Sequence, residues 1–234
     1  MKTVSSPKEE AVRAAAAHIL ACIEKKSDAV IALGALDEEL AVWDAAAAEA
    51  TARGISLAEL RLLAVCEFEG PARETEASVR SRLIAHLVEK TDAQEKNLLV
   101  PDAADPAAFD ERLSALGGLD LAVLGLGDNA RVGFNEPATP FDTYTHCQKL
   151  TAKTRAELAP LFDGEENVPL RGVTMGFQTL CRARDIIVIA LGEEKAMALY
   201  RTLYGRDDSV YPAAFLQLSS SVTVYADEEA SAKL

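Results

Sequence analysis

Apolar and polar positions along the chain fall into blocks that predict strands and helices in alternation. Short apolar runs typical of buried parallel strands occur at residues 28–33, 60–66, 97–100, 119–126, 185–191 and 221–226. Between them, apolar side chains at helical spacing predict one helix that begins after Ser6 and others at residues 40–53, 76–88, 106–116, 177–183 and 193–204. Residues 144–150 fit either a strand or an irregular crossover.

This alternation predicts an α/β fold. We expect a doubly wound, mostly parallel sheet with helices on both faces, in three Rossmann-like layers. No internal repeat or Pro/Gly/Ser-rich linker divides the chain, so we expect a single domain over residues 1–234. At the first helix, Ser6 is the expected N-cap, with Pro7 at the first helical position and Glu9 closing a capping box.

Charge and cysteine content narrow the classes of partner. The 234-residue chain carries a formal net charge of −13, which argues against nucleic acid or an anionic membrane as a partner. The four cysteines are widely spaced, so neither a disulfide framework nor a metal site is indicated. The N-terminus lacks the pattern of a signal peptide and no apolar run reaches membrane length, so we expect a soluble, cytoplasmic protein.

The segment from Gly125 to Pro137 is the strongest candidate for a site. It reads Gly-Leu-Gly-Asp-Asn-Ala-Arg-Val-Gly-Phe-Asn-Glu-Pro and follows a buried apolar run. In open α/β sheets, ligands bind where loops leave the carboxyl ends of strands. An ordinary strand-to-helix turn is the alternative interpretation, but such a turn needs neither this density of polar side chains nor the Phe-Asn-Glu-Pro ending.

This segment resembles the active-site loop of the aminosugar-6-phosphate deaminase/isomerase family. The family pattern is roughly G-x-G-x-[DN]-G-H-[ILV]-[AG]-[FL]-N-E-P, and Asn129 matches its galactosamine-6-phosphate isomerase variant. The resemblance continues through Arg171–Gly176, Leu191–Lys195 and Pro212–Leu216. The family's Gly-His pair is replaced here by Ala130 and Arg131. The lactonase branch also uses Gly-His and lacks the Asn-Glu-Pro ending, which makes it the weaker match.

The resemblance implies roles for several acidic and basic side chains. Glu67 stands where the family places its proton-transfer aspartate, with Glu69 as a rival, and a solvated loop acid is the alternative. Glu136 matches the carboxylate that orients the ring-opening histidine in the family. An arginine remains protonated in proteins and is therefore a poor acid or base. We expect Arg131 to pair with Glu136, or with another acid at the cleft, when no ligand is bound.

The phosphate-binding part of the resemblance is incomplete. Lys195 matches the family's phosphate lysine at a helix start, although Glu193 and Glu194 also suit a solvated helix start. Gly34 and Ala35 remain of the first-strand loop that cradles phosphate in the family, but its hydroxyl residues are missing. Acids follow at once, and they compete for the same amides. Pro160 aligns with a phosphate arginine of the family, although Arg155 is nearby.

Two functions therefore remain open. One is a sugar-phosphate isomerase/deaminase of amino sugar metabolism with an altered catalytic loop and weak or absent standard activity. The other is a non-catalytic sugar-phosphate-binding or oligomerisation module descended from that family. The family's chemistry implies a small-molecule sugar phosphate as partner, no metal and no organic cofactor. Self-association into a homo-oligomer is left open.

Overall fold

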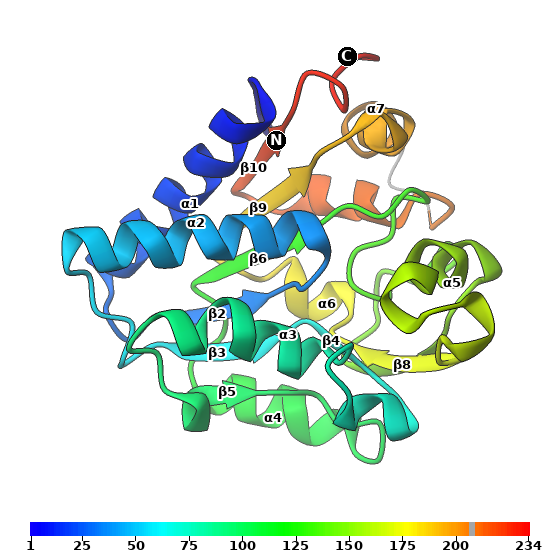
Figure 1. Ribbon diagram of the computed structural model, residues 1–234. Coiled ribbons are helices and arrows are strands. Elements are labelled where there is room, and N and C mark those ends of the chain that lie inside the picture. Colours follow the sequence, from blue (N-terminus) through cyan, green and yellow to red (C-terminus); the bar gives the residue numbers. More distant parts are fainter. Residues whose placement is uncertain (206–208) are drawn as a thin grey trace.

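The computed structural model describes residues 1–205 and 209–234, and its centre is a seven-stranded parallel sheet (Figure 1). The strand order is β1-β10-β9-β6-β2-β3-β5, and each neighbouring pair is parallel. The strands span β1 Lys2–Ser5, β2 Val30–Leu33, β3 Arg61–Ala64, β5 Leu98–Leu99, β6 Leu121–Gly125, β9 Asp185–Ala190 and β10 Val222–Ala226.

The chain builds this sheet outwards from β2 in two directions. It first adds β3 and β5 on one side, and it then returns to add β6, β9 and β10 on the other side. The order therefore reverses between β2 and β6, which are paired through Ile31 with Leu121 and Leu33 with Val123. Ligands of doubly wound folds bind at such a switch point, beyond the carboxyl ends of the strands. The predicted doubly wound parallel sheet is confirmed.

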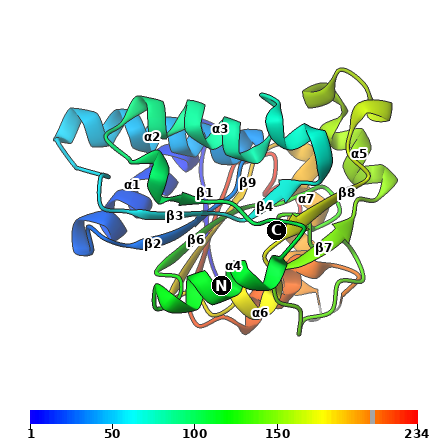
Figure 2. The same ribbon diagram turned by 90° about the horizontal axis from the view of Figure 1, so that it is seen from below.

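Helices cover both faces of the sheet. Figure 2 shows α1, α2 and α3 on one side and α4 and α6 on the other, which gives three layers. The helices span α1 Lys8–Lys25, α2 Asp37–Arg53, α3 Val79–His86, α4 Pro106–Ala115, α5 Ala152–Leu158, α6 Phe177–Leu180 and α7 Ala196–Tyr204. Among the described residues, none of the helices is long and apolar enough to cross a membrane.

Alternation along the strands explains why both faces are apolar. In β2, Ile31 and Leu33 pack into the core under α1 and α2, whereas Val30 and Ala32 pack into the core on the opposite face. Successive strand residues point to opposite faces, so a strand covered on both sides needs an unbroken apolar run. The apolar runs in the sequence therefore predicted the central strands well.

A second, antiparallel sheet of three short strands lies beside the carboxyl edge of the first. It has the order β4-β8-β7, with β4 Cys66–Phe68, β7 His146–Lys149 and β8 Arg171–Thr174. The predicted strand at residues 60–66 thus ends earlier, at Ala64, and the chain enters the second sheet at Cys66. Of the two interpretations of residues 144–150, the strand is correct for His146–Lys149.

Three local features differ from the sequence-based expectation. The N-cap of α1 is Pro7 rather than Ser6, and no side chain caps that helix. β1 is a mostly exposed edge strand and α5 is a helix of seven residues, and neither was predicted. Both are short, and the largely polar β1 gives no apolar periodicity to detect.

Candidate functional site

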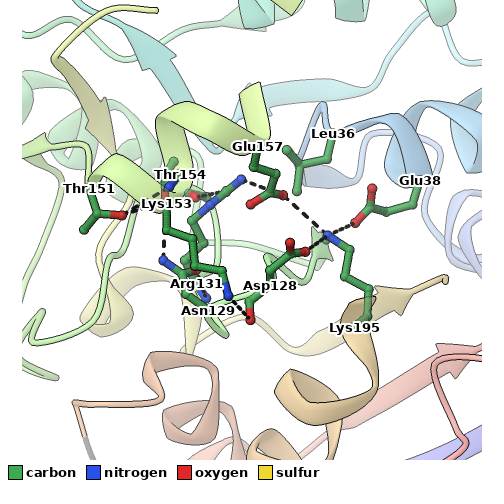
Figure 3. Close-up of polar contacts among 12 residues, drawn as sticks. Leu36, Glu38, Asp128, Asn129, Arg131, Thr151, Lys153, Thr154, Glu157 and Lys195 are labelled. Carbon is green, nitrogen blue, oxygen red and sulfur yellow. Dashed lines mark hydrogen bonds and ion pairs between the residues drawn. The ribbon is translucent and has the colours of Figure 1, made fainter. Parts of the chain in front are cut away.

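The switch point of the sheet brings two loops together. Residues 34–36 leave the carboxyl end of β2 and residues 126–137 leave that of the neighbouring β6. Lys195 follows β9, the next strand beyond β6, and α5 contributes Glu157 from above (Figure 3). These segments are distant in sequence, and they become neighbours because β2, β6 and β9 lie side by side in the sheet.

The β6 loop keeps a tight turn without a glycine at its centre. Ala130 has a φ of 60°, in the left-handed region that costs an alanine about 1 kcal/mol. The Ala130 amide donates to the carbonyl of Gly127 at 2.8 Å, and the Gly127 amide donates to the carbonyl of Arg131 at 3.0 Å. The backbone thus adopts a conformation suited to glycine, although the side chains that follow differ from the family pattern.

Glu136 is buried and held by neutral donors. Its carboxylate accepts from Asn129 Nδ2 at 2.8 Å, from the Thr151 amide at 3.0 Å and from Thr151 Oγ1 at 3.2 Å. The Asn129 Oδ1 atom in turn accepts from the Arg131 amide at 3.2 Å. Glu136 therefore connects the β6 loop to the first residues of α5.

The predicted ion pair between Arg131 and Glu136 is wrong, because among the described residues these two side chains form no ion pair. Arg131 instead lies 3.1 Å from Glu157 Oε1 through its Nη2 atom, and its Nη1 donates to the Gly133 carbonyl at 2.8 Å. The expectation of an acid partner at the cleft does hold. The partner was missed because Glu157 belongs to α5, a helix that the sequence pattern did not reveal.

Lys195 is surrounded by carboxylates, as Figure 3 shows. Its Nζ atom lies 2.9 Å from Asp128 Oδ1, 3.4 Å from Glu157 Oε1 and 3.6 Å from Glu38 Oε1, and the residue is only 4% exposed. Burial alone would lower the pKa of the ammonium group, but Glu38, Glu157 and Asp128 together raise it above its ordinary value. Lys195 is therefore fully charged, and the three surrounding carboxylates neutralise its charge.

The first-strand loop encloses a carboxylate of its own chain. The buried Glu39 side chain accepts from the Leu36 amide at 2.6 Å and from the Gly125 amide. A Cβ at Gly34 would lie 1.5 Å from Glu39 Oε1, so any other residue there would displace the Glu39 carboxylate. Burial raises the pKa of Glu39 to about 8. Glu39 thus occupies the Leu36 amide beside Gly34 and Ala35. The sequence predicted this competition between an acidic side chain and a phosphate for the loop amides.

Glu67 points away from the Lys195 side of the site. Its carboxylate accepts from the amides of Phe68, Val79 and Arg80 at 2.8, 3.1 and 2.9 Å, so it caps the first turn of α3. Burial raises its pKa, and these three hydrogen bonds act in the opposite direction. The rival Glu69 is half-buried and pairs with Arg171 at 2.9 Å.

Cys66, the residue before Glu67, points into the site, whereas Glu67 does not. Neighbouring side chains of a strand point to opposite sides, and Cys66 lines a small apolar hollow with Gly34, Glu39, Arg131 and Phe134. Burial raises the pKa of the Cys66 thiol well above its ordinary value, so the group is neutral at physiological pH. The residue that follows β3 and reaches this hollow is therefore a thiol rather than a carboxylate.

A larger cavity adjoins this hollow on the Lys195 side. Its volume is about 360 Å³, and Glu38, Asp128, Glu157 and Lys195 line it. Leu36, Arg82, Leu158 and Leu161 line both the cavity and the hollow and thus separate them. In the described residues, no group of three or more His, Cys, Asp or Glu side chains has the arrangement of a metal site.

The structure joins four of the predicted residues and leaves one apart. Asn129, Arg131, Glu136 and Lys195 form one chain of contacts through Glu157, while the carboxylate of Glu67, a residue of β4, accepts from the first amides of α3. Four acids of the site were not singled out from the sequence, namely Glu38, Glu39, Asp128 and Glu157. The run of acids at 37–39 gave a signal for Glu39, whereas Glu157 gave none.

The whole chain is similar to proteins of one family. Residues 6–225 match the family described as glucosamine-6-phosphate isomerases/6-phosphogluconolactonase. A glucosamine-6-phosphate deaminase of Lysinibacillus sphaericus is 32% identical over 92% of this chain and 94% of its own, and one of Streptomyces coelicolor is 34% identical over 91% and 84%. A structure described as a monomeric glucosamine-6-phosphate deaminase superposes with a TM-score of 0.95 and 28% identity, covering 100% of both chains. The chain belongs to the glucosamine-6-phosphate isomerase/6-phosphogluconolactonase family.

Proposed function

We propose that this family member does not deaminate amino sugar 6-phosphates and keeps the fold as a ligand-binding protein. The observation that carries this proposal is the enclosure of the Lys195 ammonium group by Glu38, Asp128 and Glu157. The relatives described above are glucosamine-6-phosphate deaminases. That reaction requires a site that accepts a phosphate dianion.

The charges around Lys195 oppose phosphate binding. Each carboxylate about 5 Å from a phosphate charge costs roughly 3 kcal/mol at an effective dielectric constant near 20. Lys195 and Arg131 together do not offset these three acids, and the downstream position aligned with a phosphate arginine is Pro160. The Glu39 carboxylate adds a further obstacle, because it accepts from the Leu36 and Gly125 amides beside the same loop.

The acid–base groups that deamination needs are also displaced. Arg131 stands at the family's histidine and cannot release a proton at physiological pH. Glu67 accepts three backbone hydrogen bonds on α3, and the neighbouring Cys66 is a neutral thiol. General acid–base groups each contribute typically ~10²–10⁴-fold to rate, so these changes would leave little turnover.

A preference for galactosamine 6-phosphate rests on Asn129 alone. In this chain the Asn129 amide donates to Glu136 and its oxygen accepts from the Arg131 amide. Both contacts lie within the protein, which supports a role of Asn129 in holding the loop. We therefore propose no choice between the two amino sugars on the basis of this residue.

A coupled ammonia assay tests the proposal. Glucosamine 6-phosphate and galactosamine 6-phosphate are each incubated with the unmodified protein, the Arg131→His variant and the Ala130→Gly/Arg131→His double variant. We expect no release above background in any of the three, because the acids around Lys195 remain in all of them. Robust turnover by the unmodified protein would overturn the proposal and favour an enzyme in which Glu136 or a water supplies the acid.

A further inference from the structure

A second cavity lies on the other face of the sheet and shares no residue with the Lys195 site. It is lined by α4, by the turn after α4 and by α6, the two helices that Figure 2 shows opposite α1, α2 and α3. Its volume is about 550 Å³. Binding sites for small molecules have volumes of roughly 300–1,000 Å³, so this cavity is large enough for a ligand of its own.

Asp110 of α4 is the only acid among the described residues that lines this cavity. Its carboxylate accepts from the Thr145 amide at 2.8 Å, from Thr145 Oγ1 at 3.0 Å and from Thr179 Oγ1 at 2.8 Å. These donors are neutral, so they fix the position of the carboxylate and leave its charge uncompensated. A carboxylate has about four lone-pair sites, and Asp110 can therefore accept a further hydrogen bond from a ligand.

Arg182, two residues beyond the end of α6, carries the opposite charge at the same cavity. Within residues 1–205 and 209–234, no other basic side chain lines it. The guanidinium carbon of Arg182 lies 6.0 Å from the centroid of the Tyr144 ring. Arg182 and Asp110 form no ion pair, either with each other or with another side chain that the structure describes. The cavity thus presents one fixed negative charge and one positive charge that do not neutralise each other directly.

These two charges select the ligand. A simple anion would leave Asp110 uncompensated, and a simple cation would leave Arg182 uncompensated. A zwitterion can donate from an ammonium group to the acid and accept from the arginine with a carboxylate. Hydrogen bonds between charged groups are stronger than neutral ones, and a carboxylate suits the fork of an arginine. The α-amino acids carry both of these groups close together.

The rest of the wall favours an apolar side chain on that ligand. Leu113 and Leu119 are buried side chains that reach the cavity, and Tyr144, which is 51% exposed, stands beside them. An aromatic ring of a ligand can pack against the ring of Tyr144 with a gain beyond the buried area. The Gln178 side chain also lines the cavity and makes no hydrogen bond in the part of the chain that the structure describes, so its amide can contact the polar end of the ligand.

We infer that this cavity binds an α-amino acid with an apolar or aromatic side chain. The ammonium group donates to Asp110, and the carboxylate accepts from Arg182. The side chain packs against Leu113, Leu119 and Tyr144. This inference goes beyond the proposed function, because the ligand is not a sugar and the cavity lies apart from Lys195.

Titration calorimetry at pH 7.4 with four small molecules tests the inference. L-Phenylalanine and L-leucine carry both charged groups, phenethylamine lacks the carboxylate of phenylalanine, and 3-phenylpropionate lacks its ammonium group. We expect phenylalanine to bind, and each of its two analogues to bind at least tenfold more weakly, since each loses one charged partner. Binding of either analogue as tight as that of phenylalanine would overturn the inference, as would the absence of heat with both amino acids.

A substitution of Arg182 locates the ligand. Arg182 is exposed, and its guanidinium contacts only the Tyr144 ring among the described side chains, so Arg182→Gln should fold normally. We expect this variant to bind phenylalanine at least tenfold more weakly and to bind phenethylamine like the unmodified protein. Arg112→Gln is the matched control, because it makes the same change of charge on an exposed part of α4 outside the cavity. Unchanged affinity for phenylalanine in Arg182→Gln would contradict the inference, and so would an equal loss in the control.

A substitution of Asp110 tests the other end of the ligand. Asp110→Asn removes the negative charge, and in a folded variant it should weaken phenylalanine binding at least tenfold without weakening that of 3-phenylpropionate. The change also disturbs the hydrogen bonds from Thr145 and Thr179, so thermal unfolding must show that the variant is folded. If it is not folded, the Arg182→Gln result decides. Phenylalanine binding that is unchanged in folded Asp110→Asn would place the ligand elsewhere and overturn the inference.

Discussion

The guanidinium of Arg131 lies 3.1 Å from the carboxylate of Glu157, and the same carboxylate oxygen lies 3.4 Å from Lys195. One acid on α5 thus links the residue that replaces the family's histidine to the residue that matches its phosphate lysine. Both cations are buried, at 1% and 4% exposure. Without Glu157, the buried Arg131 would lose its acid partner, whereas Lys195 would keep Asp128 and Glu38.

This arrangement makes Glu157 a stability residue. We expect Glu157→Ala to lower the free energy of unfolding by about 3–5 kcal/mol, because it leaves the buried Arg131 charge without its acid partner. Replacing both residues, as in Arg131→Leu/Glu157→Leu, should lower the free energy of unfolding by less than Glu157→Ala does, because no unpaired Arg131 charge remains. Urea denaturation gives the values. The control is Glu165→Ala, which breaks the more exposed pair with Arg155 and should cost less than about 1 kcal/mol. A loss of stability in the double variant equal to the summed losses of Arg131→Leu and Glu157→Leu alone would contradict an interaction between the two side chains.

Glu39 predicts a pH dependence of stability. Burial raises its pKa to about 8 in the folded protein, above its ordinary value of 4.5, so the folded state holds this proton more tightly than the unfolded state. The contribution of Glu39 to stability is therefore full below its ordinary pKa and is lost as the pH rises towards 8. The loss cannot exceed about 1.4 kcal/mol per pH unit for one proton.

Urea denaturation between pH 5.5 and 8.5 measures this slope. We expect the free energy of unfolding of the Glu39→Gln variant to fall less steeply with pH than that of the unmodified protein. Only the slopes are compared, since the glutamine amide cannot accept from both the Leu36 and Gly125 amides and lowers stability at every pH. Identical slopes for the two proteins would show that Glu39 remains charged in the folded state.

Glu67 is expected to act through α3 rather than through substrate. Glu67→Ala removes the acceptor of the Val79 and Arg80 amides at the helix start, and it should lower the free energy of unfolding by about 2–4 kcal/mol. Glu69→Ala, two residues further along, disrupts only an exposed pair with Arg171 and should change it by less than about 1 kcal/mol. Equal and small effects of the two substitutions would restore Glu67 as a candidate for proton transfer.

The sequence predicted the fold more completely than the site. Central strands such as β2 and β6 are buried on both faces, so their apolar runs are unmistakable, and their alternation with helices predicts a parallel sheet. The second sheet was harder to see, because Cys66–Phe68 continues almost directly from β3 and three of the four residues of Arg171–Thr174 are glycine or polar. Short strands that pair over long sequence distances leave little local pattern.

Within the site, loop residues were located and their partners were not. Asn129, Arg131 and Glu136 could be found because they lie in one motif after one strand. The acid that pairs with Arg131 comes from α5, and its position depends on a tertiary contact that no local spacing encodes. Glu67 follows the alternation of the strand, since Leu62, Ala64, Cys66 and Phe68 pack into one core. What its side chain meets there, the first amides of α3, depends on a tertiary contact that no local spacing encodes.

The most direct test of this account is whether Lys195 can receive a phosphate. Titration calorimetry with glucosamine 6-phosphate compares the unmodified protein with a Glu38→Gln/Asp128→Asn/Glu157→Gln variant, in which the lysine keeps its charge and loses its three acid partners. The account predicts a Kd weaker than about 1 mM for the unmodified protein, and a measurable gain in affinity for the variant once folding has been verified. Binding of glucosamine 6-phosphate by the unmodified protein in the micromolar range would contradict it.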